Sequence, residues 1–311
     1  MSTRVLRAAT RSSPLALWQA NHVAGLLGAA HPSLRVELVP VDTEGDRRLD
    51  VPISSFGGKG VFAKEVQAAV LDGRADFAVH SAKDLPAVTV PGLVLAAVPE
   101  RGDPRDALVG STLAELVPGA VVATGSQRRR AQLARLRPDL RFIELRGNMA
   151  TRLSKIPTGG AIVVAAVALE RLGLDRELSQ ILSTDQMVPQ VGQAALGIEC
   201  ASMATETAEM LLAIEHAPSR RRVDAERAFL IELGGDCDLP AGAHATLGGP
   251  SGPDRLDDSP DTDALITLDA FLARAGEAGA DTVRTVIVGS DPVAVGTDAA
   301  RAVRSALANK A

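Results

Sequence analysis

The sequence predicts an α/β fold in several domains, with a smaller α+β domain at the C-terminal end. Short strand-like apolar runs alternate with helical patterns over most of the chain, which is typical of α/β domains with largely parallel sheets. The last three strand-like runs follow one another without crossover helices, which indicates an antiparallel sheet. The length of 311 residues also exceeds what one hydrophobic core usually holds.

The composition is that of an ordinary globular protein, with 46% hydrophobic and 23% charged residues. No apolar run reaches the 18 or so residues of a transmembrane helix, and the N-terminus lacks the apolar segment of a secretory signal. Two cysteines, Cys200 and Cys237, argue against a disulfide scaffold and, without paired His or Cys spacing, against a structural zinc site. We therefore expect a soluble cytoplasmic protein that binds no metal and no membrane.

The chain begins with a strand at 5–9, a polar turn, and a helix that starts near Pro14. A hydroxyl at the N-cap and proline at the first helical position are the usual start signals of a helix. Arg11 and Ser13 lie at this helix N-terminus, where backbone donors and the helix dipole attract anions. Both residues are therefore candidates for anion binding.

A strand at 35–41 is followed by a stretch without periodicity at 42–60. A loop of that length in a compact domain is usually a lid or a disordered segment, and a moving lid is our hypothesis. The stretch closes with GGKG at 57–60, which lacks the spacing of a P-loop. A helix is expected over 63–71, stopped by Gly73.

Polar clusters come directly after several of the strand-like runs that follow. In open α/β sheets, ligands bind outside the carboxyl ends of the strands. We therefore expect strand ends from two domains to converge on one cleft. The strands are expected at 77–80, 93–98, 121–124, 142–145 and 162–165, and the helices near 127–136, 149–155 and 167–172.

After Pro218 the pattern changes to that of the small antiparallel α+β domain. An acidic, proline-rich stretch at 249–263 is expected to be a solvated connector. The helices are expected at 220–233 and 294–308, and the strands at 243–247, 264–272 and 282–288.

The net charge of −5 argues against nucleic acid as the main partner. The segment 127–155 nevertheless holds nine basic residues and only two acidic ones. An aromatic fraction of 2%, without tyrosine, leaves little for stacking on bases. A small polyanionic ligand fits this segment better than DNA, although each arginine alone is also typical of a solvated helix face.

The stretch ADFAVHSAKDLP at 75–86 places Ser81, Lys83 and Asp84 where a buried strand ends. A carboxylate there can stabilise a developing cation or move a proton, while the lysine holds an anionic group. The alternative is a surface ion pair of little energetic weight. His80, on the strand itself, is expected to be a core histidine.

Two further turns carry hydroxyls and arginines. TGSQRR at 124–129 opens one helix, and Arg146-Gly147-Asn148, followed by Arg152, opens another. Arginine presents a fork of donors that suits carboxylate or phosphate. Together, the turns predict an anion-binding cleft between two domains.

Cys237 lies on a glycine-led turn, GGDCDLP, and is a candidate nucleophile or attachment point. Asp236 and Asp238 favour its neutral thiol over the thiolate. Cys200 lies among apolar residues and is expected to be a small core residue.

Several collinear stretches together resemble the porphobilinogen deaminase (hydroxymethylbilane synthase) family, and the match runs along nearly the whole chain. The stretches are ATRSSPLALWQA at 9–20, GGKGVFAKE at 57–65, ADFAVHSAKDLP at 75–86, DPRDALV at 103–109, TGSQRR at 124–129, LRGNMATRL at 145–153, VGQAALGIEC at 191–200 and the Cys237 turn.

The resemblance implies an enzyme of three domains, formed by residues 1–99 with 195–215, 100–194, and 216–311. The first two are similar to the lobes of a periplasmic-type binding protein, and the third carries the cysteine. The family holds a dipyrromethane cofactor by a thioether, here to Cys237. It condenses four porphobilinogen molecules with loss of ammonia and releases hydroxymethylbilane by hydrolysis. A monomer without an obligate protein partner is implied.

The resemblance also implies roles for individual residues. Asp84 matches the catalytic carboxylate, which stabilises the cationic azafulvene that is left when ammonia departs. Porphobilinogen carries an acetate and a propionate, which need cations and hydrogen-bond donors. The implied cofactor-binding residues are Cys237, Lys83, Ser81, Thr124, Ser126, Arg128, Arg129, Arg146 and Gln193, and the implied substrate-binding residues are Arg11, Ser13, Arg152, Lys59 and Phe62.

The chain departs from the family pattern in four places. Asp236 precedes the cysteine where a glycine is usual, Gly125 stands where serine is common, and Ala194 replaces the last glycine of GQG. A lysine found before GGKG in bacterial relatives is missing from 53–56. The rival interpretation is a non-catalytic solute-binding protein that uses a two-lobed clamp, which would carry no pyrroles on Cys237.

Overall fold

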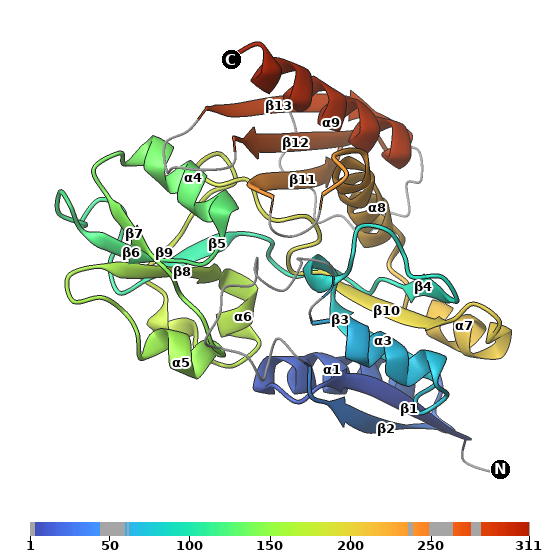
Figure 1. The fold of residues 1–311 in the computed structure, drawn as a ribbon. Helices are drawn as coiled ribbons and strands as arrows, with labels where there is room; N and C mark the ends of the chain where they lie inside the picture. Colours follow the sequence, from blue (N-terminus) through green and yellow to red (C-terminus); the bar gives the residue numbers. More distant parts are fainter. Residues whose placement is uncertain are drawn as a thin grey trace. The chain divides into compact units, whose positions relative to one another are not determined.

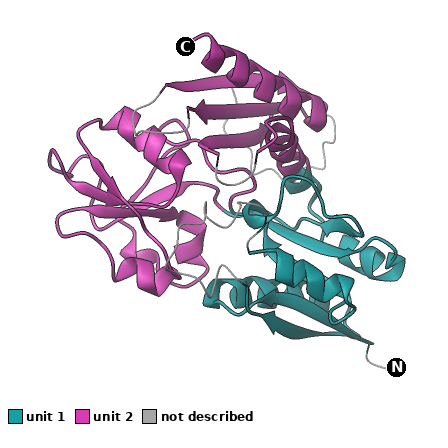
Figure 2. Ribbon diagram, in the orientation of Figure 1, with its two compact units in different colours: residues 1–102, 194–220 teal, residues 103–193, 221–311 magenta. Residues whose placement is uncertain are grey.

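The computed structural model describes residues 4–43, 60, 62–235, 239–248, 264–274 and 281–310. The chain divides into two compact units (Figure 2). Unit 1 is formed by residues 1–102 and 194–220, and unit 2 by residues 103–193 and 221–311. Within the described ranges, no helix combines the length and hydropathy needed to cross a membrane. The predicted second and third domains thus share one unit, and the three-domain division stays a prediction.

Unit 1 is built on a five-stranded sheet in the order β2-β1-β3-β10-β4 (Figure 1). The central strand β1 (Arg4–Arg11) pairs in parallel with β2 (Leu34–Val41) and β3 (Phe77–Ser81). Strand β10 (Leu196–Ala201) runs antiparallel between β3 and β4 (Leu93–Ala97).

Helices cover both faces of this sheet. On one face, α1 (Pro14–Ala30) and α7 (Thr205–Leu212) bury apolar residues against Phe77 and Val79. On the other, α3 (Lys64–Leu71) packs against a cluster that includes Ala78. The alternation of Phe77, Ala78 and Val79 between the two cores follows from the two-residue period of a strand.

The first sheet of unit 2 has the order β7-β6-β8-β5-β9. Strand β6 (Val121–Ala123) pairs in parallel with β7 (Arg141–Ile143) and β8 (Ala161–Ala165). Strand β5 (Asp106–Val109) runs antiparallel to β8 and to β9 (Gln180–Ile181). Parallel and antiparallel neighbours thus follow one another in the same way as in unit 1.

The helices of this part are short. They are α4 (Gln127–Leu136), α5 (Met149–Leu153), α6 (Ala166–Glu170) and the 3₁₀ turn η3 (Asp175–Glu177). The first two begin directly after the carboxyl ends of β6 and β7, and both therefore lie where ligands bind in open α/β sheets.

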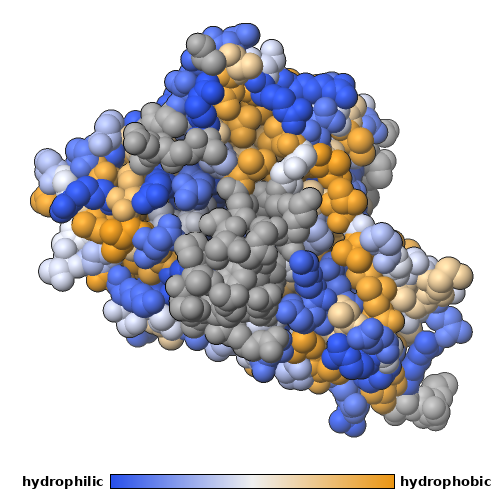
Figure 3. Space-filling view, viewed as in Figure 1, coloured by the Kyte–Doolittle hydropathy of each residue, from blue (hydrophilic) through white to orange (hydrophobic). Residues whose placement is uncertain are grey.

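The second sheet of unit 2 is antiparallel and has three strands, β11 (Ala241–Leu247), β12 (Ile266–Ala273) and β13 (Thr282–Gly289). Its core is shared with α8 (Ala217–Glu232) and α9 (Pro292–Ala308), which buries a stripe of apolar residues. Hydrophobic residues also reach the surface over this sheet (Figure 3), where β13 exposes two valines.

The fold class is confirmed: two α/β sheets and one small antiparallel sheet. The expectation of largely parallel sheets is wrong, because β5 and β10 enter the two larger sheets antiparallel. Both strands contain residue types that are depleted in strands, Asp106 in β5 and Gly197 and Glu199 in β10, and they therefore gave no strand signal in the sequence. Residues 44–59 of the predicted lid and the predicted connector at 249–263 lie outside the described residues.

Candidate active site

Asp84 lies on a single 3₁₀ turn, η2 (Ala82–Asp84), directly after β3. The amide of Ala82 donates to the carbonyl of Ala195 at 3.0 Å, and that of Leu85 donates back to Ala82. These bonds hold the turn against the start of β10. The Asp84 side chain is 28% exposed, and its Oδ2 lies 3.9 Å from Nη1 of Arg11. The carboxylate is thus accessible and has a cation beside it.

Arg11 ends β1 and is itself held by an aromatic ring. Its Cζ lies 4.2 Å from the centroid of the Phe62 ring, within the range of a cation–π contact. Phe62 precedes α3 in the sequence. The structure therefore brings together Arg11, Phe62 and Asp84, three of the predicted site residues.

The two predicted serines of unit 1 take part in the local fold. Ser13 is the N-cap of α1, as predicted, and its Oγ accepts from the amide of Ala16 at 3.4 Å. Ser81 exchanges two hydrogen bonds with Gln19 of α1, at 2.8 and 3.2 Å. Gln19 was not predicted; it fixes the end of β3 from the α1 face. Lys83 is partly buried beside Asp84.

Arg128 and Arg129 of α4 meet on Asp106, an aspartate that the sequence analysis missed. Asp106 is fully buried in β5. Nη2 of Arg128 lies 2.8 Å from its Oδ2, and Nε and Nη2 of Arg129 donate to its Oδ1 at 3.0 and 2.7 Å. Nε2 of Gln193 donates to the same oxygen at 3.0 Å. We call these four residues the Asp106 cluster.

The Asp106 cluster carries a net positive charge, because two arginines surround one aspartate. Burial opposes ionisation of Asp106, but the charges of Arg128 and Arg129 and the hydrogen bonds of Gln193 and Arg128 outweigh it and lower its pKa to about 2. Burial also lowers the pKa of Arg128. Among the described residues, the buried Nε of Arg128 has no hydrogen-bond partner. Two guanidiniums on one carboxylate can still attract a further anion.

The turn at Thr124–Ser126 is shaped by its own hydroxyls. Oγ1 of Thr124 accepts from the amide of Ser126 at 3.2 Å, and Oγ of Ser126 caps α4 by accepting from the amide of Arg129 at 3.4 Å. A Cβ on Gly125 would lie 3.1 Å from Oε2 of Glu144. The glycine at this departure from the family pattern therefore fits the packing around it.

Arg146 and Arg152 flank a second turn. Gly147 has a φ of 116°, a conformation that strongly favours glycine. Nε of Arg152 donates to its carbonyl at 2.8 Å, and Asn148 caps α5 by accepting from the amide of Thr151. Both arginines are partly buried. The turn thus holds two cations near the carboxyl end of β7.

Two predicted residues, Lys59 and Cys237, lie outside the described residues, and so does Asp236. Cys200 is fully buried in β10, as predicted, and burial together with the charge of Glu199 raises the pKa of its thiol. Ala194, the departure within GQA, has a φ of 70°, where a glycine would be unstrained. That the site residues of the two units face one cleft stays a prediction.

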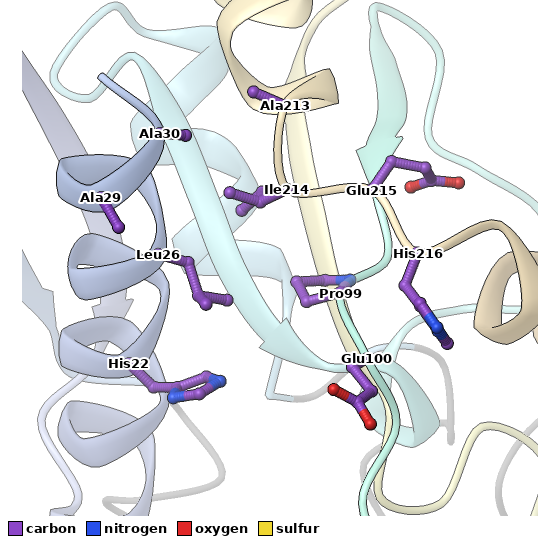
Figure 4. Close-up of a pocket in the computed structure, with 10 residues that line it drawn as sticks. All are labelled: His22, Leu26, Ala29, Ala30, Pro99, Glu100, Ala213, Ile214, Glu215 and His216. Atoms are coloured by element: carbon purple, nitrogen blue, oxygen red, sulfur yellow. The ribbon is translucent and has the colours of Figure 1, made fainter. Parts of the chain in front are cut away.

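A cavity of about 380 Å³ lies elsewhere in unit 1, and none of the predicted site residues lines it. Its apolar wall includes Leu26 and Ile214. Figure 4 shows His22 on α1 across from Glu100 and His216. Within the described ranges, no three His, Cys, Asp or Glu side chains are grouped to hold a metal ion.

Comparison with known proteins identifies one family. The family model described as "Porphobilinogen deaminase, dipyromethane cofactor binding domain" matches residues 6–209. This range includes Asp84, the Asp106 cluster and both arginine turns.

Several solved structures have a weak likeness to the chain. One is the methionine binding protein MetQ, at 12% identity and a TM-score of 0.43, covering 72% of this chain and 94% of that one. Another is the VFT2 domain of BvgS from Bordetella pertussis, at 15% identity and a TM-score of 0.38, covering 72% and 92%. A TRAP periplasmic solute binding protein from Ralstonia eutropha has 14% identity and a TM-score of 0.39, covering 73% and 80%. Likeness at this level does not bear on function.

Proposed function

Because this chain belongs to the porphobilinogen deaminase family, we propose that it condenses four porphobilinogen molecules head to tail and releases the linear tetrapyrrole hydroxymethylbilane by hydrolysis. Ammonia leaves at each condensation, which makes the enzyme a transferase of porphyrin biosynthesis. The two cysteines in the whole chain fit action in a reducing cytosol. Action as a monomer is the simplest assumption.

The residues that the structure describes fit a dipyrromethane cofactor. Its two pyrrole rings carry four carboxylates, and arginine and lysine are the natural partners of such groups. Partly buried Arg11, Lys83, Arg146 and Arg152 supply accessible cations. The buried Nε of Arg128 supplies a donor that still lacks a partner among the described residues. We propose Cys237 as the point of attachment, by a thioether.

When bound, the cofactor supplies a nucleophilic pyrrole carbon. The chain's own residues then have to bind the carboxylates of cofactor and substrate, orient the substrate for the reaction and stabilise the cation that forms. We assign Arg11 and Lys83 to the carboxylates of the incoming substrate and of the cofactor. The Phe62 ring keeps the Arg11 guanidinium in place, because the stacked position 4.2 Å away restricts its rotamers.

Asp84 is the proposed catalytic residue. Loss of ammonia leaves a cationic azafulvene, and a carboxylate placed beside it lowers the free energy of the transition state that leads there. The same carboxylate can accept hydrogen bonds from pyrrole N–H groups and hold a proton. The observation that carries this assignment is the position of Asp84: it is 28% exposed on a turn fixed to β10, next to Arg11.

The decisive experiment is the intact mass of the purified protein, followed by peptide mapping across Cys237. We expect an excess mass equal to two linked pyrrole units, located on the peptide that contains Cys237. A Cys237→Ser variant is the matched control and should carry no excess mass.

An unmodified Cys237 after incubation with porphobilinogen would contradict the proposal. Binding of porphobilinogen without modification or ammonia release would instead indicate a protein that binds the ligand and does not react with it. Ammonia release without a modified cysteine would contradict the attachment point and leave the reaction in place.

A further inference from the structure

A buried polar cluster of Gln67, His80 and Glu199 lies on the α3 face of the unit 1 sheet, and the proposed mechanism does not use it. Glu199 of β10 is only 2% exposed. Nε2 of Gln67 donates to its Oε2 at 2.8 Å, and Nε2 of His80 lies 3.2 Å from the same oxygen. One carboxylate oxygen thus links α3, β3 and β10.

The contact between His80 and Glu199 is close, with 3.2 Å between Nε2 and Oε2. An unprotonated Nε2 would present a lone pair to a carboxylate oxygen, so a proton has to lie on one of the two atoms. Nε2 is not aligned for a hydrogen bond with any described residue. Electrostatic attraction between the imidazole and the carboxyl group therefore holds the two side chains together, and their burial keeps water from weakening it.

The cluster lies at the end of β3, the strand from which the turn that carries Asp84 begins. His80 comes four residues before Asp84 and pairs in register with Gly197 of β10. On the opposite face of the sheet, Ser81 is held by Gln19. Between them, the two sets of contacts fix the end of β3 from both faces, and the turn η2 begins there.

We propose that His80 and Glu199 are positioning residues for Asp84: their buried contact fixes the end of β3 and with it the placement of the catalytic carboxylate. This inference rests on the proposed function where it calls Asp84 catalytic, but its structural part stands apart from the reaction. Neither residue touches substrate in this account. Their effect reaches the reaction through Asp84.

The test compares Glu199→Gln, which keeps the size and removes the charge, with Gln67→Met, which removes the other partner of the same oxygen. Backbone amide resonances of Lys83 and Asp84 should shift in Glu199→Gln and stay in place in Gln67→Met. The kcat for hydroxymethylbilane should fall about tenfold or more in Glu199→Gln, with KM within about twofold, because a small misplacement of a reacting group slows the chemical step.

Repeating the Glu199→Gln substitution in an Asp84→Glu variant distinguishes a positioning effect on Asp84 from a general loss of rigidity. In Asp84→Glu the carboxylate is already misplaced, so adding Glu199→Gln should lower kcat far less than it does in the wild type. Equal losses in both backgrounds would overturn the proposal. So would shifts of the Asp84 amide that are as large in Gln67→Met as in Glu199→Gln.

The proposal stays testable if one variant does not fold or the wild type shows no turnover. His80→Gln removes the imidazole from the other side of the pair, and it should shift the same two amides. Unshifted amides in His80→Gln would overturn the positioning role. Absence of turnover in the wild type would refute the proposed function, while the amide shifts would still decide whether the pair positions Asp84.

Discussion

Asp106 in unit 2 and Asp84 in unit 1 both lie beside arginine, yet they differ in burial and in their number of partners. Asp106 is 0% exposed and is held by Arg128, Arg129 and Gln193. Asp84 is 28% exposed, and its ion-pair distance to Arg11 is 3.9 Å. A buried carboxylate with three partners stabilises the fold, whereas an accessible carboxylate with one distant partner can still interact with a ligand. The predictions below test this distinction.

The largest effect is expected for Asp106→Asn. It leaves the buried Arg128 and Arg129 without a counter-charge, and such a loss costs about 3–5 kcal/mol of unfolding free energy. Urea denaturation measures it. The matched control is Asp103→Asn on the same segment, whose partner Arg105 is 44% exposed; it should cost less than about 1 kcal/mol. Equal losses of unfolding free energy in the two variants would contradict the structural role given to the buried Asp106.

Asp84→Asn should have the opposite effect, with a large loss of turnover and almost no loss of stability. We expect kcat to fall by roughly 10² to 10³, since the lost charge stabilised a cation in the transition state, while the thermal midpoint stays nearly unchanged. Asp76→Asn is the control, because Asp76 is 27% exposed, pairs with Arg7, and directly precedes β3, the strand that leads to the turn of Asp84. Its turnover should equal that of the wild type. Wild-type kcat in Asp84→Asn would refute the role given to Asp84.

Low pH should remove part of the stabilisation that Asp106 gives to the folded protein. Its pKa in the folded protein is about 2, lowered from 3.8, so its stabilisation is present above pH 4 and is lost as the pH falls toward 2. The difference in unfolding free energy between wild type and Asp106→Asn should therefore shrink by roughly 2 kcal/mol over this range. A difference that is constant with pH would show that charge is not what Asp106 contributes.

The smallest effect is expected at Ala194, where the chain returns to unit 1. Its φ of 70° is costly for alanine, so Ala194→Gly should stabilise the protein by about 0.5–1 kcal/mol, net of the entropy that glycine adds to the unfolded chain. Ala195→Gly, at the next residue, should destabilise it. Denaturation of both variants gives the signs, and a loss of stability in Ala194→Gly would contradict the strain.

Local signals in the sequence predicted much of the fold. The start of α1 at Ser13 and Pro14 is one example, since hydroxyl cap and proline act over a few residues. Strands β5 and β10 were missed, because β5 begins with Asp106 and β10 contains Gly197 and Glu199, residue types that are depleted in strands. Their pairing depends on contacts with residues far away in the chain.

The same limit applies to the candidate site. Residues at strand ends, such as Arg11 and Asp84, were predicted because the carboxyl ends of strands collect ligands. Asp106 and Glu199 were missed, since their partners lie 23 and 132 residues away. For Glu199 a signal was nonetheless present, because a single acidic residue within the otherwise apolar stretch 196–201 needs a partner if it is buried.

The position of β10 has a consequence for how the protein is made. Strands β3 and β4 each bond to β10 and enclose it in the sheet, yet β10 follows them by about a hundred residues. During synthesis, the ribosome must therefore deliver all of 103–193 before the N-terminal sheet can close. Until then, two strand edges stay open to aggregation, and the sheet of unit 1 cannot reach its native structure before β10 has been made.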